Sequence, residues 1–158
     1  MKRRLTSHLL LAVLGMAALK THAQNQTPAN VALVGWTDPA TGLNWTQQDN
    51  GSDVNWNQAN AYCSNLRLGG YSDWRLPTID ELQAIYDPSI EIPGQWSSGN
   101  AATWHVKGNL KISGWIWSST QKNAAQAWNF SFNSETRSSN RLGDSRYNHA
   151  LCVRRSGE

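Results

Sequence analysis

A chain of 158 residues carries 14 lysines and arginines against 11 aspartates and glutamates, but this excess of positive charge is local. Four of the basic residues lie before residue 24, and without that segment 10 basic residues face 11 acidic ones, a net charge of −1. Such a balance gives no argument for nucleic-acid binding, which usually needs a clearly basic surface. The length that remains suits one domain.

Residues 1–23 have the pattern of a secretory signal peptide. Lys2–Arg4 form a basic start, a mostly apolar run follows over Leu9–Leu19, and small residues precede a cleavage site at Ala23. The run is too short to span a membrane, although a short buried helix is an alternative, and no other stretch approaches spanning length. We therefore predict a periplasmic or extracellular protein after cleavage near Ala23, with a flexible mature N-terminus at 24–30 and one domain over 31–155.

The first elements expected in this domain are a β-hairpin and a helix. A strand over 31–36, a turn at 38–42 and a returning strand are indicated by proline and glycine between apolar residues. A helix over 56–66 should follow, because apolar residues recur there at three- and four-residue spacing. Asn55 or Asp53 can cap its N-terminus.

The most informative segment is the stretch Gly69–Leu82. It reads as a glycine turn, a short aromatic segment with a charge pair, and a helix start. Thr78 and Glu81 have capping-box spacing, in which each side chain satisfies a backbone donor at the start of a helix, and Pro77 fixes the entry of the chain. This second helix should extend to about Tyr86, with its apolar side chains facing inward.

Two residues of this stretch are expected to be structural. Trp74 is a predicted core residue, as are Trp117 and Trp128. Arg75 lies between two apolar residues and is expected to be buried or half-buried, in a salt bridge with Asp73, Asp80 or Glu81. A structural role is likewise expected for Arg154.

Residues 89–110 show little regular period and predict a long loop, a kind of segment that is often functional in compact domains. Its two tryptophans, Trp96 and Trp104, are candidate ligand platforms, with core roles as the alternative.

The last part of the chain predicts strands, and the first of them begins at Trp115. Alternation over 127–132 predicts another, with aromatic residues on one face and small or polar residues on the other, followed by a turn at 133–134 and a last strand at 150–154. The whole order indicates an α+β fold, with two helices packed on a twisted antiparallel sheet.

Cys63 and Cys152 are the two cysteines of the chain. In an oxidising compartment an even pair indicates a disulfide, which here would tie an early helix to the last strand. A catalytic or redox pair is the alternative, but the Cys-x-x-Cys spacing typical of redox motifs is absent.

Several motifs resemble those of one bacterial family. They are Asp38 with Thr41–Leu43 and Trp45, Ala61–Cys63, Leu68–Leu82, Trp117–Thr120, Ala127–Phe130 and Cys152–Arg154. Together they resemble the Lcl C-terminal domain family, a secreted family long labelled a domain of unknown function and typified by the C-terminal domain of the Legionella collagen-like adhesin. The resemblance covers about residues 31–155. It implies a fold similar to C-type lectins and sulfatase-modifying factors, and binding to sulfated glycosaminoglycans. The Gly-x-y stalk of that adhesin is absent from this sequence.

The first functional hypothesis is a non-catalytic module that binds a sulfated or acidic glycan, or another anionic surface polymer. Arginine offers a planar fork that matches sulfate or carboxylate, and an exposed aromatic ring can stack on a sugar. The candidate ligand residues are Arg137, Arg141, Arg146, Tyr147, Trp96 and Trp104. Ordinary surface or structural roles are the alternative for the arginines.

Two other functions are weighed against it. The polar loops and the tryptophans suit an interaction domain for an envelope protein, or an envelope-structural domain, equally well. An enzyme related to sulfatase-modifying factors is less favoured, because the two cysteines are expected to pair and His105 and His149 lie far apart in sequence without recognisable metal-ligand spacing. We therefore expect no catalytic residue, no metal ligand and no cofactor. Calcium dependence is not expected either, because the Glu-Pro-Asn tripeptide of calcium-dependent lectins and an acidic cluster are both absent.

Overall fold

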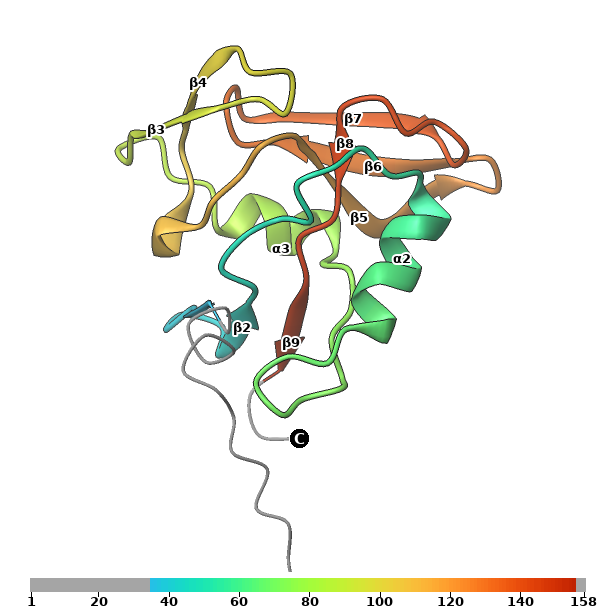
Figure 1. Cartoon of the computed structure of the whole chain (residues 1–158), viewed down its shortest axis with the longest axis horizontal. Helices are drawn as coiled ribbons and strands as arrows, with labels where there is room; N and C mark the ends of the chain where they lie inside the picture. Colours follow the sequence, from blue (N-terminus) through green and yellow to red (C-terminus); the bar gives the residue numbers. More distant parts are fainter. Residues whose placement is uncertain (1–34, 156–158) are drawn as a thin grey trace, which may run out of the picture.

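The computed structural model describes residues 35–155, which fold into nine strands, two helices and a short 3₁₀ turn (Figure 1). The elements are β1 (Trp36–Thr37), β2 (Leu43–Trp45), α2 (Trp56–Asn65), α3 (Ile79–Ala84), β3 (Ile92–Gln95), β4 (Ala101–Trp104), η1 (Lys107–Asn109), β5 (Trp115–Asn123), β6 (Gln126–Ser131), β7 (Thr136–Arg141), β8 (Asn148–His149) and β9 (Val153–Arg155). Three sheets lie beside two helices, so the predicted α+β class is confirmed. The expected signal peptide and mature N-terminus, residues 1–30, lie outside the described residues.

The four-stranded sheet, in the order β7-β6-β5-β8, has apolar residues packed on both faces. Ile116 and Phe130 pair across β5 and β6 and lie on the face that α3 covers, here called the α3 face. Trp117 and Ala127 lie on the opposite face with α2, here called the α2 face. The predicted alternation along β6 is confirmed, and burial of both faces explains why even Asn129 is only 1% exposed. In this sheet β8 pairs with β5 in parallel, although antiparallel strands were predicted.

A second sheet joins the two ends of the described chain. β2 lies between β1 and β9 and is antiparallel to both, with Trp45 opposite Trp36 on one side and Val153 on the other. The predicted early hairpin and last strand are thus present. β1 begins at Trp36, and residues 31–34 of the predicted first strand lie outside the described residues. Figure 1 shows this sheet at the lower end of the molecule, away from β3, β4, β7 and β8.

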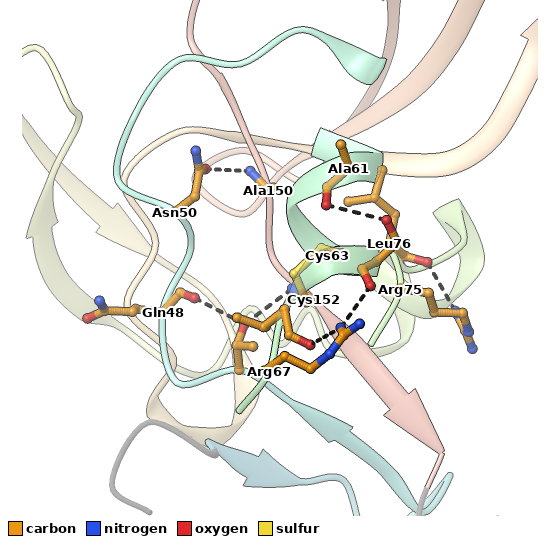
Figure 2. The surroundings of a disulfide bond; sticks show 12 residues. Gln48, Asn50, Ala61, Cys63, Arg67, Arg75, Leu76, Ala150 and Cys152 are labelled. Carbon is orange, nitrogen blue, oxygen red and sulfur yellow. Dashed lines mark hydrogen bonds between the residues drawn. A yellow bond between two sulfur atoms is a disulfide. The ribbon is translucent and has the colours of Figure 1, made fainter. Parts of the chain in front are cut away.

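The predicted disulfide joins Cys63 on α2 to Cys152, just before β9. The two Cα atoms are 5.5 Å apart, and both cysteines are fully buried. Figure 2 shows the bond between the helix and the C-terminal strand segment, with the loop around Asn50 alongside. The side chain of Asn50 accepts a hydrogen bond of 2.7 Å from the backbone N–H of Ala150, so this loop and the C-terminal segment are also joined directly.

Both helices begin where the sequence places them. Asn55, rather than Asp53, caps α2 and forms a capping box with Gln58. Thr78 and Glu81 form the predicted capping box of α3, which ends earlier than expected, at Ala84. Neither helix within residues 35–155 has the length and apolar character needed to cross a membrane.

The predicted long loop over 89–110 is wrong, because it contains the β3-β4 hairpin and η1. Pro93 and Gly94 stand within β3, where both residue types are normally disfavoured. A tertiary contact explains the glycine, since a Cβ added at Gly94 would lie 2.5 Å from Nε1 of Trp104. This indole belongs to β4, so glycine at position 94 lets the two strands of the hairpin pack closely.

The arginines assigned structural roles do form ion pairs. Arg75 binds Glu81, the third of its predicted partners, through two hydrogen bonds of 2.7 and 2.8 Å. Its side chain is 43% exposed, more than expected. Arg154 is buried, donates from Nε to Asp73 at 2.7 Å and stacks 3.6 Å above the centre of the Tyr71 ring. The ion pair between Asp73 and Arg154 therefore joins the segment before α3 to β9.

Candidate functional site

Two adjoining hollows form a polar and aromatic groove beside the β8 edge of the four-stranded sheet. The larger hollow has a volume of about 260 Å³ and is lined by Trp96, Ser98, Asn100, Trp115 and Tyr147. The smaller hollow, of about 120 Å³, is lined by Trp115, Asn129, Ser138, Asn140, Arg146, Tyr147 and Asn148. Because Trp115 and Tyr147 line both hollows, we treat them as one surface and call it the Tyr147 groove.

Three segments that are distant in sequence build the larger hollow, and β6 and β7 add residues to the smaller one. The β3-β4 turn supplies Trp96, whose N–H donates to the carbonyl of Asn100 at 2.8 Å. The Trp96 ring packs edge-on against buried Trp104, with ring centres 4.8 Å apart. The N–H of Ser97 also donates to Ser113, just before β5, at 2.7 Å. The hairpin is thereby fastened to the strand that contributes Trp115.

Tyr147 is the most prominent side chain of the groove. It is 51% exposed, although it is a large aromatic residue. Its backbone has a φ of 60°, a left-handed conformation that is uncommon for residues other than glycine and is often found at functional sites. The carbonyl of Tyr147 accepts a hydrogen bond of 2.8 Å from the N–H of Trp115, which fixes the two aromatic residues relative to each other.

The floor of the smaller hollow is a chain of amides. Asn148 donates from Nδ2 to the carbonyl of Arg146 at 3.0 Å, and its Oδ1 accepts from Nδ2 of Asn129 at 2.5 Å. Oδ1 of Asn129 is buried and has no hydrogen-bond partner within residues 35–155. A buried acceptor without a partner is unusual in a folded protein.

The structure does not bring the three candidate arginines onto one surface. Arg137 reaches α3, where Nη2 lies 2.7 Å from a carboxylate oxygen of Asp80 and Nε donates to Gln83. Arg141 lies four residues further along β7 and so shares the α3 face. Arg146 instead lines the smaller hollow, with Ser138 on the α2 face. Arg146 lies in the turn between β7 and β8, outside the strand that carries the other two arginines.

The other candidate residues divide in the same way. Tyr147 and Trp96 line the groove, whereas Trp104 is buried at 1% exposure beneath Trp96. Trp115, Asn129 and Asn148 line the groove but were not singled out from the sequence. The available signals were the position of Trp115 at the start of a predicted strand and that of Asn129 on the small or polar face of the next, and neither signal points to a binding site by itself.

A buried histidine lies directly after the groove residues in the chain. His149 is fully buried, with Nδ1 at 3.2 Å from Asp49 and 3.1 Å from Ser113 Oγ, and Nε2 at 3.2 Å from Asp53. Burial by itself would lower the pKa of His149, but hydrogen bonds and charge attraction from Asp49 and then Asp53 together raise it above its ordinary value. The cluster joins the 47–55 loop to β8.

We expect His149 to make stability depend on pH. A raised pKa means that the folded state binds the proton more tightly, so this stabilisation is complete below the ordinary histidine pKa of about 6.5 and is lost as pH rises through the folded-state value. The free energy of unfolding should therefore fall as pH rises above about 6.5, as measured by urea denaturation at a series of pH values. His149→Gln should remove this pH dependence of the unfolding free energy, and His105→Gln should keep it. If the free energy of unfolding changed equally with pH in wild type and in His149→Gln, the raised pKa of His149 would not be the cause.

The same cluster does not have the geometry of a serine–histidine–aspartate relay. In such a relay the serine and the carboxylate lie on opposite nitrogens of the ring. Here Ser113 and Asp49 share Nδ1, and Asp53 occupies Nε2. Residues 35–155 also contain no group of three or more histidine, cysteine or acidic residues placed to hold a metal ion. What the groove offers is aromatic surface, amides, hydroxyls and one guanidinium.

Comparison with known proteins adds one finding to this geometry. No curated protein matches the chain. A family model described as the Lcl C-terminal domain matches residues 35–154, well over half of the chain and nearly all of the described residues. The match covers both helices, the disulfide and every segment of the Tyr147 groove. The chain therefore belongs to the Lcl C-terminal domain family.

Proposed function

We propose that this domain is a non-catalytic module that binds a glycan in the Tyr147 groove. The observation that carries the proposal is an exposed tyrosine shared by two adjoining hollows with polar rims. A sugar has an apolar ring face and a polar edge, so it needs an aromatic platform surrounded by amides and hydroxyls. Tyr147 and Trp115 supply the platform, and Asn100 and Asn140 lie among the polar groups.

Family membership and the disulfide support this reading. The family suggests an adhesin-associated domain. The Cys63–Cys152 bond is typical of proteins that work in an oxidising compartment, which fits export to the periplasm or the cell surface. We also propose that the fold is C-type-lectin-like, as the resemblance implies, because two helices beside antiparallel sheets and long connections are compatible with it.

The arrangement of charge favours a glycan of low charge density over a polyanion. Arg146 is the one charged residue among the described residues that line the groove, and Arg137 is paired with Asp80 on the other face of the sheet. A polyanion is bound by several cations along its path. Binding that resists increasing salt is therefore expected, whereas steep loss with salt would favour an anionic polymer.

Tyr147→Ala should weaken glycan binding by at least about tenfold, because removing the platform removes the stacking surface for one sugar ring. The measurement is isothermal titration calorimetry with a ligand selected on an array of bacterial and host glycans. Tyr62→Ala is the matched control, since Tyr62 is also an exposed tyrosine, 40% accessible, but lies on α2 outside the groove. Equal affinity of Tyr147→Ala and wild type would place the site elsewhere, and an array without ligands would favour a protein partner.

A further inference from the structure

Asn129 lines the smaller hollow of the Tyr147 groove, and its buried amide has a hydrogen-bond partner on the nitrogen but none on the oxygen within residues 35–155. The carbonyl of Arg146 accepts from Nδ2 of Asn148, which leaves Oδ1 of Asn148 facing Asn129. Asn129 must then present its Nδ2 to that oxygen, because two acceptors do not bond to each other. Its own Oδ1 is left as a buried acceptor without a partner in the described chain.

Resting on the proposed function, we infer that this hollow receives the acetamido group of an N-acetylated amino sugar. An acetamido group has one N–H donor, one carbonyl acceptor and one methyl group. The smaller hollow offers the complementary set: the unpartnered acceptor of Asn129, the donating guanidinium of Arg146, and the aromatic surface of Trp115 and Tyr147. The sugar ring extends over Tyr147 toward the larger hollow, where Ser98 and Asn100 face its hydroxyls.

The unpartnered acceptor also argues against acidic groups in the smaller hollow. Sulfate and ionised carboxylate carry acceptors only, so either would pair with Arg146 but oppose the oxygen of Asn129. A site built to bond a donor discriminates strongly against ligands that lack it, because the buried polar group then stays unpaired. The inference therefore concerns the chemical class of the ligand, and it differs from recognition of a sulfated polymer.

Three tetrasaccharides that differ only at the second carbon of each sugar test this inference. They are the β-1,4-linked tetramers of N-acetylglucosamine, glucosamine and glucose, titrated into the purified protein by calorimetry. We expect the acetylated tetramer to bind at least about tenfold more tightly than either of the others. A heparin-derived tetrasaccharide, titrated in parallel, should bind more weakly than the acetylated tetramer.

Two variants connect the preference to the smaller hollow. Arg146→Ala and Asn129→Ala should each reduce the preference for the acetylated tetramer over the glucose tetramer to within about threefold, because each removes one partner of the acetamido group. Arg141→Ala is the matched control, since Arg141 lies on the α3 face, and should leave the preference unchanged. Asn129 is buried, so circular dichroism must first show that its variant is folded. Arg146 is exposed, so its variant provides the test by itself if Asn129→Ala does not fold.

The outcomes separate this inference from the proposed function. Equal binding of all three tetramers that is lost in Tyr147→Ala would overturn the acetamido inference and leave glycan binding in the groove intact. Tighter binding of the heparin fragment would overturn it in favour of an anionic ligand. Absence of binding by all four saccharides would overturn the acetamido inference alone if the glycan array yields another ligand, and both proposals if it yields none. An acetyl preference that survives in Arg146→Ala would place the recognition outside the smaller hollow and also overturn the inference.

Discussion

Replacing Cys63 and Cys152 together by alanine should lower the free energy of unfolding by about 4–5 kcal/mol. The disulfide links positions 89 residues apart, and a bond that closes so long a loop strongly restricts the unfolded chain. Both cysteines are fully buried, and the bond joins α2 to the segment before β9. Urea denaturation of the oxidised wild type and of the double variant measures the difference.

Reduction of the wild type provides the control for this comparison. A thiol reductant should shift the urea midpoint of the wild type toward that of the double variant and should leave the variant unchanged. A double variant within about 1 kcal/mol of wild type would contradict the account, since it would mean that packing alone fixes the C-terminal segment against α2.

The second large effect is expected at Trp117. This side chain is fully buried on the α2 face, and Trp117→Ala should destabilise the fold by about 3–5 kcal/mol because it leaves a large cavity. The loss includes a hydrogen bond of 2.8 Å from Nε1 to the carbonyl of Val54, which holds the loop before α2. Thermal unfolding followed by circular dichroism measures the expected change.

Trp45 provides a matched comparison for the hydrogen bond. It is as deeply buried as Trp117, but its Nε1 has no hydrogen-bond partner within the described chain. Trp117→Phe leaves the carbonyl of Val54 without its donor, whereas Trp45→Phe removes a donor that bonds to nothing there. We therefore expect Trp117→Phe to cost more stability than Trp45→Phe, by about 1–3 kcal/mol. The opposite order would show that packing around the indole, and not the hydrogen bond, dominates.

Much of the fold could be predicted because its signals are local. The capping box of Thr78 and Glu81 depends on residues three apart, and the structure has that helix start at the predicted position. The β3-β4 hairpin could not be predicted in this way, because Pro93 and Gly94 oppose a strand locally. At Gly94 the reason is a non-local contact, because the indole of Trp104 on the paired strand leaves no room for a Cβ.

The candidate site was only partly predictable for a related reason. Arg146, Tyr147 and Trp96 were identified by residue type, and the structure places all three on the groove. Arg137 is a candidate by residue type as well, but it lies on the α3 face of β7, where Asp80 binds it. The pairing of His149 with Asp49 spans 100 positions, and only the folded topology brings the two together.

The small sheet of β1, β2 and β9 has a consequence for how the domain can be mounted. It brings both ends of the described chain to one end of the molecule, while β3, β4, β7 and β8, which build or border the Tyr147 groove, lie at the other (Figure 1). A surface, bead or neighbouring domain attached through either terminus would therefore leave the groove pointing outward. This geometry suits immobilised formats such as biolayer interferometry, in which attachment at the N-terminus and at the C-terminus should give the same affinity.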